Sequence, residues 1–265
     1  MRDCKNLVAL FVYKKLREVV HIIYINAPIG IGKTSLTRIL TKDLGTKGFY
    51  EDVENIPMLK EFYADGNKSR NDLSFALQIA FLNYRFKQLK EGLYLAEHEN
   101  MANTVYDSSL LSDSLMAFNL YKRGEFPQAM FDLYMELNQN MTSDVAAHPF
   151  NGIPDLIIYL DAPFELMLDH IKLRGREMET EDPKLVDYYK SVWETYSHWY
   201  QGYSQSAVLR IDMKKHDFVN NVNDRNTVLN MIEQRLVELG KLTQTEFEQI
   251  KAERAEKFND AEENV

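Results

Sequence analysis

The segment 27–34, which reads APIGIGKT, constrains the fold of this chain more than any other part of the sequence. It follows a run of β-branched and aromatic residues at 21–26 that is typical of a buried strand, and it precedes a helical pattern at 34–44 that ends at Gly45. A glycine-containing loop between a strand and a helix, closed by lysine and threonine, is the setting of a P-loop. In such a loop the backbone N–H groups bind phosphate oxygens, the lysine reaches the β- and γ-phosphates, and the threonine hydroxyl binds Mg²⁺.

This motif predicts which residues contact the phosphates of a bound nucleotide. They are Ala27, Ile29, Gly30, Ile31, Gly32, Lys33, Thr34 and Ser35. Ala27 stands where the motif has its first glycine, and a side chain is tolerated there if φ is negative. The alternative is an ordinary strand–turn–helix connection that contains Gly-Lys-Thr by chance.

Strand and helix patterns alternate along the rest of the chain. Strands are predicted at 21–26, 49–51, 103–107, 155–161 and 207–213, and helices at 34–44, 73–90, 126–143, 163–174, 184–200 and 227–239. The alternation predicts a three-layer α/β fold with a mainly parallel five-stranded sheet flanked by helices, which binds ligands beyond the carboxyl ends of its strands. We expect one domain at 21–242, an N-terminal extension at 1–20, and a polar C-terminal tail at 243–265 that is a solvated helix or a frayed end.

The composition excludes several classes of function. The formal net charge of −9 argues against a general binder of nucleic acid or of membranes. No apolar run approaches the roughly 20 residues of a membrane span. The single cysteine, Cys4, permits no disulfide within the chain and favours a reducing compartment, so we expect a cytoplasmic protein. The histidines and the cysteine lack the spacing of a metal site.

An acidic segment follows the second expected strand. Glu51 would lie across the cleft from the γ-phosphate, where a P-loop kinase needs a base for the acceptor hydroxyl. The alternative is a surface carboxylate in an acidic turn. No lysine or arginine occurs between Glu51 and Met58, so a neutral acceptor is favoured over one that already carries a phosphate.

The chain resembles the deoxynucleoside kinase family, most closely its lactobacillus-type deoxyadenosine and deoxyguanosine kinases. The resemblance covers about 21–242. Its motifs are the P-loop, Phe49-Tyr50-Glu51 with Asn55 and Pro57, Leu77-Gln78, Phe81-Leu82-Asn83 with Arg85, Asp107, Asp113, Arg174-Gly175-Arg176, Asp187-Tyr188-Tyr189-Lys190, Trp199-Tyr200, Ile211-Asp212 and Asp217-Phe218. It implies the P-loop kinase fold with an arginine-bearing lid, ATP and Mg²⁺ as cofactors, and transfer of the γ-phosphoryl of ATP to the 5′-hydroxyl of a deoxyribonucleoside. A purine is favoured.

The resemblance also implies roles for the residues on the nucleoside side. Glu51 matches the catalytic base of the family. The residues that match those reading the nucleobase are Gln78, Arg85 and Asp113, and those that match the pair holding the sugar 3′-hydroxyl are Tyr63 and Glu179. Arg85 and Asp113 could instead form a purely structural ion pair.

On the phosphate side, Arg174 and Arg176 match lid arginines that act with Lys33 on the developing phosphate charge, although a solvated turn is the alternative. Asp107 matches an acid that helps Thr34 to hold Mg²⁺ and lies near the substrate. Family members are usually dimers that pair through long helices, so a homodimer, or a heterodimer with a related subunit, is implied.

Two positions depart from the family pattern more than Ala27 does. Ser108 replaces an arginine near the substrate 5′ end, and His170 replaces the first lid arginine. Lys172 or Arg123 could substitute for the missing charge. Two alternatives to an active deoxynucleoside kinase therefore stay open, a weakly active or inactive nucleotide-binding partner subunit and a nucleoside monophosphate kinase.

Overall fold

Five parallel strands form one sheet with the order β2-β3-β1-β4-β5. In the computed structural model, the residues described are 21–51, 58–64, 67–99, 101, 103–145, 152–180 and 182–262. The strands are β1 (Ile22–Asn26), β2 (Gly48–Phe49), β3 (Thr104–Tyr106), β4 (Leu156–Asp161) and β5 (Ala207–Asp212). β1 lies at the centre, where all five of its residues are buried, as its apolar run predicts. The expected fold class is confirmed.

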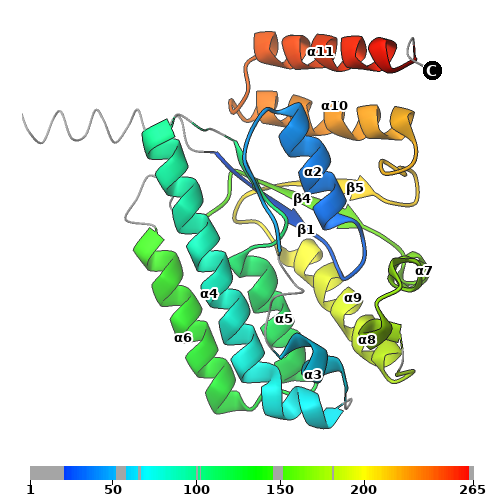
Figure 1. The fold of residues 1–265 in the computed structure, drawn as a ribbon. Helices are drawn as coiled ribbons and strands as arrows, with labels where there is room; N and C mark the ends of the chain where they lie inside the picture. Colours follow the sequence, from blue (N-terminus) through cyan, green and yellow to red (C-terminus); the bar gives the residue numbers. More distant parts are fainter. Residues whose placement is uncertain are drawn as a thin grey trace, which may run out of the picture.

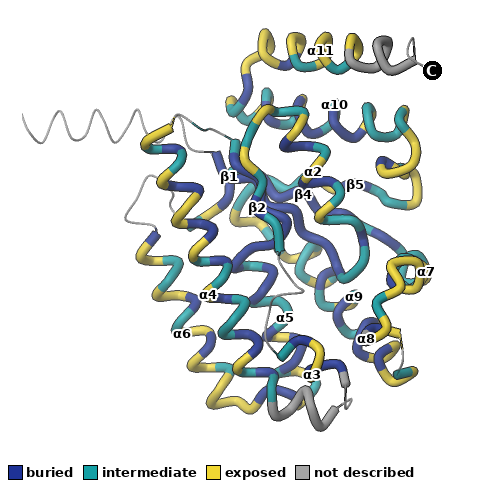
Figure 2. Tube along the Cα trace, in the orientation of Figure 1, coloured by how far each residue is buried: buried dark blue, intermediate teal, exposed yellow. Residues whose placement is uncertain are grey.

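Helices cover both faces of this sheet (Figure 1). On one side lie α2 (Lys33–Asp43), α10 (Val222–Glu238) and α11 (Gln244–Glu262), and on the other α4 (Asn67–Glu99), α5 (Leu110–Lys122), α6 (Gln128–Val145) and α9 (Leu185–Gly202). The short helices α3 (Leu59–Ala64), α7 (Phe164–Arg174) and α8 (Glu177–Thr180) complete the fold. Figure 2 shows that the inward faces of these helices are buried and their outer faces exposed, so the sheet lies inside a three-layer core.

Several helices differ from the expected bounds. α4 is longer at both ends than the predicted 73–90, and α3, α5 and α8 were not predicted. α5 begins directly after β3 because Ser109 caps it, with its hydroxyl accepting a hydrogen bond from the backbone N–H of Ser112 at 3.1 Å. α10 begins five residues earlier than expected, where the side chain of Asn221 caps its first turn.

The C-terminal stretch is a helix over Gln244–Glu262, which was one of its two expected forms. No helix in the described part of the chain is long and apolar enough to cross a membrane. The expected N-terminal extension, 1–20, lies outside the described residues, as do the motif residues Asn55 and Pro57. The division into domain, extension and tail, and the cytoplasmic location, stay predictions.

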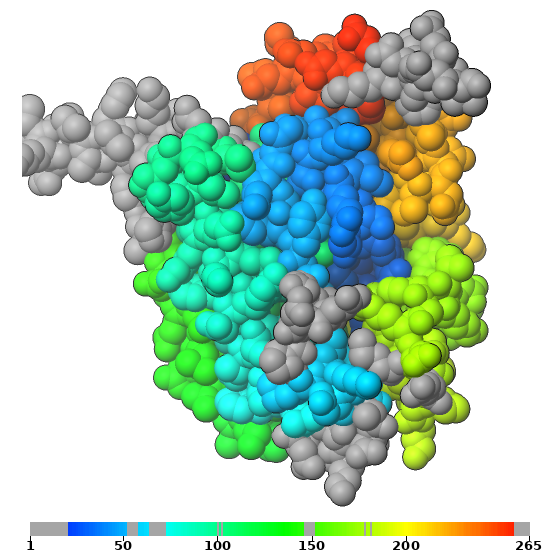
Figure 3. Space-filling view, viewed as in Figure 1, coloured from blue at the N-terminus to red at the C-terminus, as the bar shows by residue number. Residues whose placement is uncertain are grey.

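The sheet and its helices place three parts of the chain around one region. On the face shown in Figure 3, α2 in blue, α3 in light blue and the yellow-green helices α7 and α8 lie near one another. These helices follow the carboxyl ends of strands or lie beside those ends. A parallel sheet binds its ligands at the carboxyl ends of its strands.

Candidate active site

The loop between β1 and α2 has the backbone of an anion-binding turn. Gly30 and Gly32 have φ of 81° and 93°, which favours glycine, and Gly32 caps α2. A Cβ on Gly30 would lie 3.0 Å from Cγ1 of Ile171, so the loop also packs closely against α7. Among the described non-glycine residues, only Met58 and Asn103 have a positive φ, so Ala27 meets the condition expected for a side chain at its position.

Two side chains at the start of α2 bear the polar groups of the loop. Lys33 folds back over the loop, and its ammonium donates hydrogen bonds to the carbonyl oxygens of Ala27 at 3.1 Å and Pro28 at 3.4 Å. Burial lowers the pKa of Lys33, and the nearby carboxylates of Glu51 and Asp107 oppose that effect. The hydroxyl of Thr34 donates to Oδ2 of Asp107 at 2.7 Å, which joins the loop to the end of β3.

Arg85, on α4, lies between two carboxylates. Its NH2 group donates to Oε1 of Glu51, and its Nε lies 3.7 Å from Oδ2 of Asp113 on α5. The side chain of Arg85 is only 2% exposed. Burial raises the pKa of Asp113 to about 7, with Arg85 lowering it and Glu51 raising it.

The end of β2 is held by the same helix. The backbone carbonyl of Tyr50 accepts hydrogen bonds from Nε2 of Gln88 at 2.7 Å and from the hydroxyl of Tyr84 at 3.1 Å. Gln88 in turn accepts a hydrogen bond from NH1 of Arg85 at 3.3 Å. The carboxylate of Glu51 is thus fixed both through its backbone and through its ion pair.

The lid arginines share one carboxylate. NH2 of Arg174 donates to Oε2 of Glu179, and NH1 of Arg176 lies 3.5 Å from Oε1 of the same residue. Glu179 is almost fully buried, and its backbone carbonyl accepts a hydrogen bond from the hydroxyl of Tyr189 at 2.8 Å. α7 ends in a left-handed turn at Gly175, with φ of 66°, which turns the chain between the two arginines.

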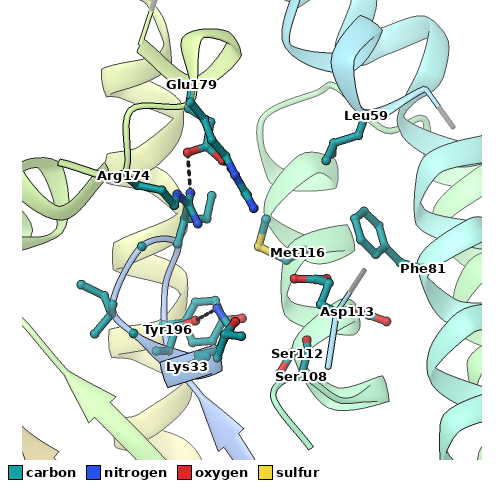
Figure 4. Close-up of a pocket in the computed structure, with 18 of the residues that line it drawn as sticks. Lys33, Leu59, Phe81, Ser108, Ser112, Asp113, Met116, Arg174, Glu179 and Tyr196 are labelled. Atoms are coloured by element: carbon teal, nitrogen blue, oxygen red, sulfur yellow. Dashed lines mark hydrogen bonds and ion pairs between the residues drawn. The ribbon is translucent and has the colours of Figure 1, made fainter. Parts of the chain in front are cut away.

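These groups surround a cleft of about 540 Å³. In Figure 4, Arg174 and Glu179 face Leu59 and Phe81 across it, and Lys33 and Ser108 lie at one end. The predicted site residues that line the cleft are Ala27, Ile29, Gly30, Ile31, Gly32, Lys33, Thr34, Ser35, Glu51, Tyr63, Gln78, Asp113, Arg174, Arg176 and Glu179. The structure therefore brings together positions that are far apart in the sequence.

Two predicted site residues, Arg85 and Asp107, lie behind this lining. Both are almost fully buried, and each bonds to a residue that does line the cleft. Burial raises the pKa of Asp107, and so does the charge of Glu51, whereas Arg85, Thr34 and Lys33 lower it. They are placed to hold lining groups rather than to form the wall themselves.

The two departures from the family pattern lie in different places. Ser108 lines the cleft, whereas His170 lies on α7. The pKa of Asp217 is lowered by hydrogen bonds from Asn220 and, more weakly, by His170, so the imidazole lies near the loop that follows β5.

Several lining residues were not predicted for the site. They are Arg38, Leu59, Phe62, Leu77, Phe81, Ser108, Ser112, Met116, Tyr188 and Tyr196. Most are apolar or aromatic residues on helices, where the sequence pattern of a cleft wall is the same as that of a core. In the sequence, Ser108 stands out only for the arginine that it replaces, and the spacing of Arg38 from Thr34 on one helix is the signal that points to Arg38.

Comparison with known proteins agrees with this arrangement. The sequence model of the deoxynucleoside kinase family matches residues 23–238. A deoxyguanosine kinase of Lactobacillus acidophilus is 39% identical over 223 residues, which cover 83% of this chain and 93% of the relative. A deoxyadenosine kinase of the same organism is 35% identical over 226 residues, which cover 84% and 100%.

A solved structure has the same fold. A deoxyadenosine kinase from M. mycoides with bound dATP superposes with a TM-score of 0.63 at 23% identity, covering 80% of this chain and 98% of that one. The family match spans both the phosphate loop and the lid, and the relatives match over nearly their full length. The chain therefore belongs to the deoxynucleoside kinase family.

Proposed function

We propose that this deoxynucleoside kinase uses Glu51 as the base that accepts the proton of the 5′-hydroxyl while the γ-phosphoryl of ATP moves to the 5′-oxygen. In that step the bond from the γ-phosphorus to the ADP oxygen breaks and the bond to the 5′-oxygen forms. The observation that carries the proposal is that Glu51 lines the same cleft as Lys33 and is held there by Arg85. A fixed carboxylate beside a phosphate loop suits general base catalysis.

Thr34 and Asp107 would hold Mg²⁺ with the phosphates. Their oxygens are 2.7 Å apart, and hydroxyl and carboxylate oxygens are ligands that this ion prefers. No cluster of three or more His, Cys, Asp or Glu side chains suited to a metal occurs within the part of the chain that the structure describes. The other ligands would therefore be phosphate oxygens and water, as is usual for Mg²⁺ in kinases.

A neutral nucleoside fits the acceptor end better than a monophosphate. Glu51 lines the cleft, and no lysine or arginine occurs in the sequence between Glu51 and Met58, where an acceptor that already carries a phosphate would need cations. Tyr63 and Glu179 line the same cleft, where they would bind the 3′-hydroxyl. The lid arginines, Arg174 and Arg176, which pair with Glu179, would meet the phosphate charge.

A purine is the favoured base. Oε1 of Gln78 is buried and accepts no hydrogen bond from the described residues, so it offers an acceptor to an exocyclic amino group. Adenine, guanine and cytosine all carry such a group and thymine does not, so this acceptor disfavours thymine. The relatives named deoxyguanosine kinase and deoxyadenosine kinase support a purine over cytosine.

The chain would act as a dimer formed through α5 and α6. Phe118 on α5 and Met130 and Leu133 on α6 are 41%, 43% and 46% exposed, which leaves an apolar surface on the outer side of these helices. Sedimentation velocity should show a dimer for the wild type and a monomer for Leu133→Asp. A monomeric wild type that binds no related subunit would contradict this assembly.

The reaction is tested by supplying Mg-ATP with dA, dG, dC or dT, and with dAMP as the phosphorylated acceptor, and identifying the products by mass spectrometry. We expect the 5′-monophosphate of dG, dA or both, and no diphosphate from dAMP. Turnover on dAMP alone would identify a monophosphate kinase. Binding of ATP without turnover on any acceptor would identify an inactive partner subunit.

A further inference from the structure

One cation that lines the cleft, Arg38, belongs neither to the phosphate loop nor to the lid. Arg38 lies on α2 one helical turn beyond Thr34, its side chain is exposed, and it lines the cleft together with Glu51 and Ser108. Residues four apart on a helix share a face. Arg38 therefore continues the face that begins with Thr34 at the phosphate loop.

This face of α2 lies against the carboxyl ends of β2 and β3. At one end Thr34 bonds to Asp107, just past β3, and at the other the hydroxyl of Thr41 lies 3.1 Å from the hydroxyl of Tyr50, just past β2. Between them, Cζ of Arg38 lies 5.5 Å from the centre of the Tyr50 ring. The guanidinium of Arg38 is therefore held over the ring of the residue that precedes Glu51, and Arg38 and Glu51 line the same cleft.

With respect to the described residues, Arg38 has donors to spare, unlike Arg85, Arg174 and Arg176. Arg85 is shared by two carboxylates, and the two lid arginines share Glu179. Among the described residues, no carboxylate pairs with Arg38. Its contact with the face of Tyr50 attracts the cation without occupying its N–H groups, which leaves the planar fork available to a phosphate.

The two cations that the sequence had suggested as substitutes for the missing arginine are engaged elsewhere. Lys172 is 71% exposed on α7 and lies 3.9 Å from Asp169. Arg123 donates to Oε1 of Glu125 at 2.9 Å and to the hydroxyl of Ser191 at 3.2 Å. Neither lines the cleft that Arg38 and Ser108 share.

We propose that Arg38 binds the phosphoryl group on the acceptor side as it passes to the 5′-oxygen, and stays bound to the 5′-phosphate of the product. This inference rests on the proposed function, in which the proton of the 5′-hydroxyl goes to Glu51. Arg38 exchanges no proton. It supplies positive charge and paired N–H donors where Ser108 supplies neither.

The test compares Arg38→Gln, Arg38→Lys and the wild type, with Lys42→Gln as the matched control because Lys42 is exposed on the same helix. In Arg38→Gln we expect kcat to fall by roughly 10- to 100-fold while the KM for the nucleoside stays within about threefold, since the contact forms with the transferred group. Arg38→Lys should recover part of the loss, and Lys42→Gln should match the wild type. A kcat for Arg38→Gln within twofold of the wild type would overturn the proposal.

Calorimetric binding of the products dGMP and dAMP gives a second readout that needs no turnover. Arg38→Gln should weaken the binding of whichever monophosphate the wild type binds by about tenfold, and leave the affinity for the matching nucleoside unchanged. Equal affinities of mutant and wild type, or no monophosphate binding by the wild type, would refute the role of Arg38. Absence of wild-type turnover would instead count against the proposed function, and the binding data would still decide on Arg38.

Discussion

Arg85 holds two carboxylates of the cleft in place with one guanidinium. Glu51, just after β2, and Asp113, on α5, both form ion pairs with Arg85, and the three side chains are largely buried. Such a set stabilises the fold only while it is complete, because removing one member leaves the others buried without a partner. The residue that positions the proposed base is therefore also a structural one.

We expect Arg85→Met to lower the free energy of unfolding by about 3 kcal/mol at pH 8, because two carboxylates lose their partner. The loss should be smaller at pH 6. Arg85 lowers the pKa of Asp113, so without it Asp113 takes up a proton more readily as the pH falls and its buried charge is removed. Urea unfolding at both pH values measures the difference.

The control for that experiment is Lys87→Met, which removes an exposed cation from the same helix. It should change stability by less than about 0.5 kcal/mol. Equal stabilities of Arg85→Met and the wild type at pH 8 would show that the ion pairs contribute nothing to the fold.

At the scale of elements, α4 packs against β3 through a glycine. A Cβ on Gly92 would lie 1.9 Å from the hydroxyl of Tyr106 and 3.1 Å from Cε2 of Phe49. The rings of Phe49 and Tyr106 are stacked, with centroids 4.7 Å apart, so neither can move easily. The close approach sets the distance between α4, which carries Gln78 and Arg85, and the ends of the strands.

Gly92→Ala should therefore destabilise the protein by about 2–3 kcal/mol, although alanine is the better helix former. Gly202→Ala is the matched control, because Gly202 also lies in a helix, as the last residue of α9. A Cβ on Gly202 would have no atom within 4 Å. It should leave stability unchanged or raise it by up to about 1 kcal/mol. Thermal unfolding of both variants decides, and an unchanged midpoint for Gly92→Ala would contradict this packing.

The sequence was sufficient to predict the elements with strong local patterns and insufficient for those set by tertiary contacts. The phosphate loop and four of the strands were predicted because apolar runs and glycine spacing are local signals, whereas β2 shares only Phe49 with its expected range, 49–51. α3 and α8 have only six and four residues, so neither has a long periodic pattern of its own, and α5 follows the last residue of β3 by only four positions. Cleft-lining residues such as Met116 and Tyr196 could not be distinguished from core residues by sequence, because whether such a side chain faces a cleft or the core depends on how the neighbouring helices pack.

At the scale of the whole molecule, the C-terminal helix is tied to the phosphate-loop helix. Arg254 on α11 donates to both carboxylate oxygens of Asp43 at 2.8 and 2.7 Å, to Oδ1 of Asn230 at 2.9 Å, and to Glu233 on α10. Asp43 is the last residue of α2. A polar segment beyond the family match is thereby fixed to the helix that carries the phosphate loop.

This network should make stability depend on pH. Burial and the neighbouring Asp43 raise the pKa of Glu233 to about 8, against the opposing effect of Arg254. The folded state then keeps a proton that the unfolded state releases, so stability falls as pH rises from about 5 to about 8. Glu233→Gln should remove about 1–2 kcal/mol of that fall, measured by urea unfolding across this range. A pH dependence identical to the wild type would show that Glu233 does not titrate there.

Whether Glu51 is the base is decided by the single-turnover rate of phosphoryl transfer by Glu51→Gln, with Mg-ATP and the preferred deoxynucleoside at saturation. We expect a rate at least about 100-fold below that of the wild type, because the amide cannot accept the 5′ proton, with ATP affinity unchanged within about threefold. A rate within fivefold of the wild type, with ATP bound normally, would contradict the assignment of Glu51 as the base.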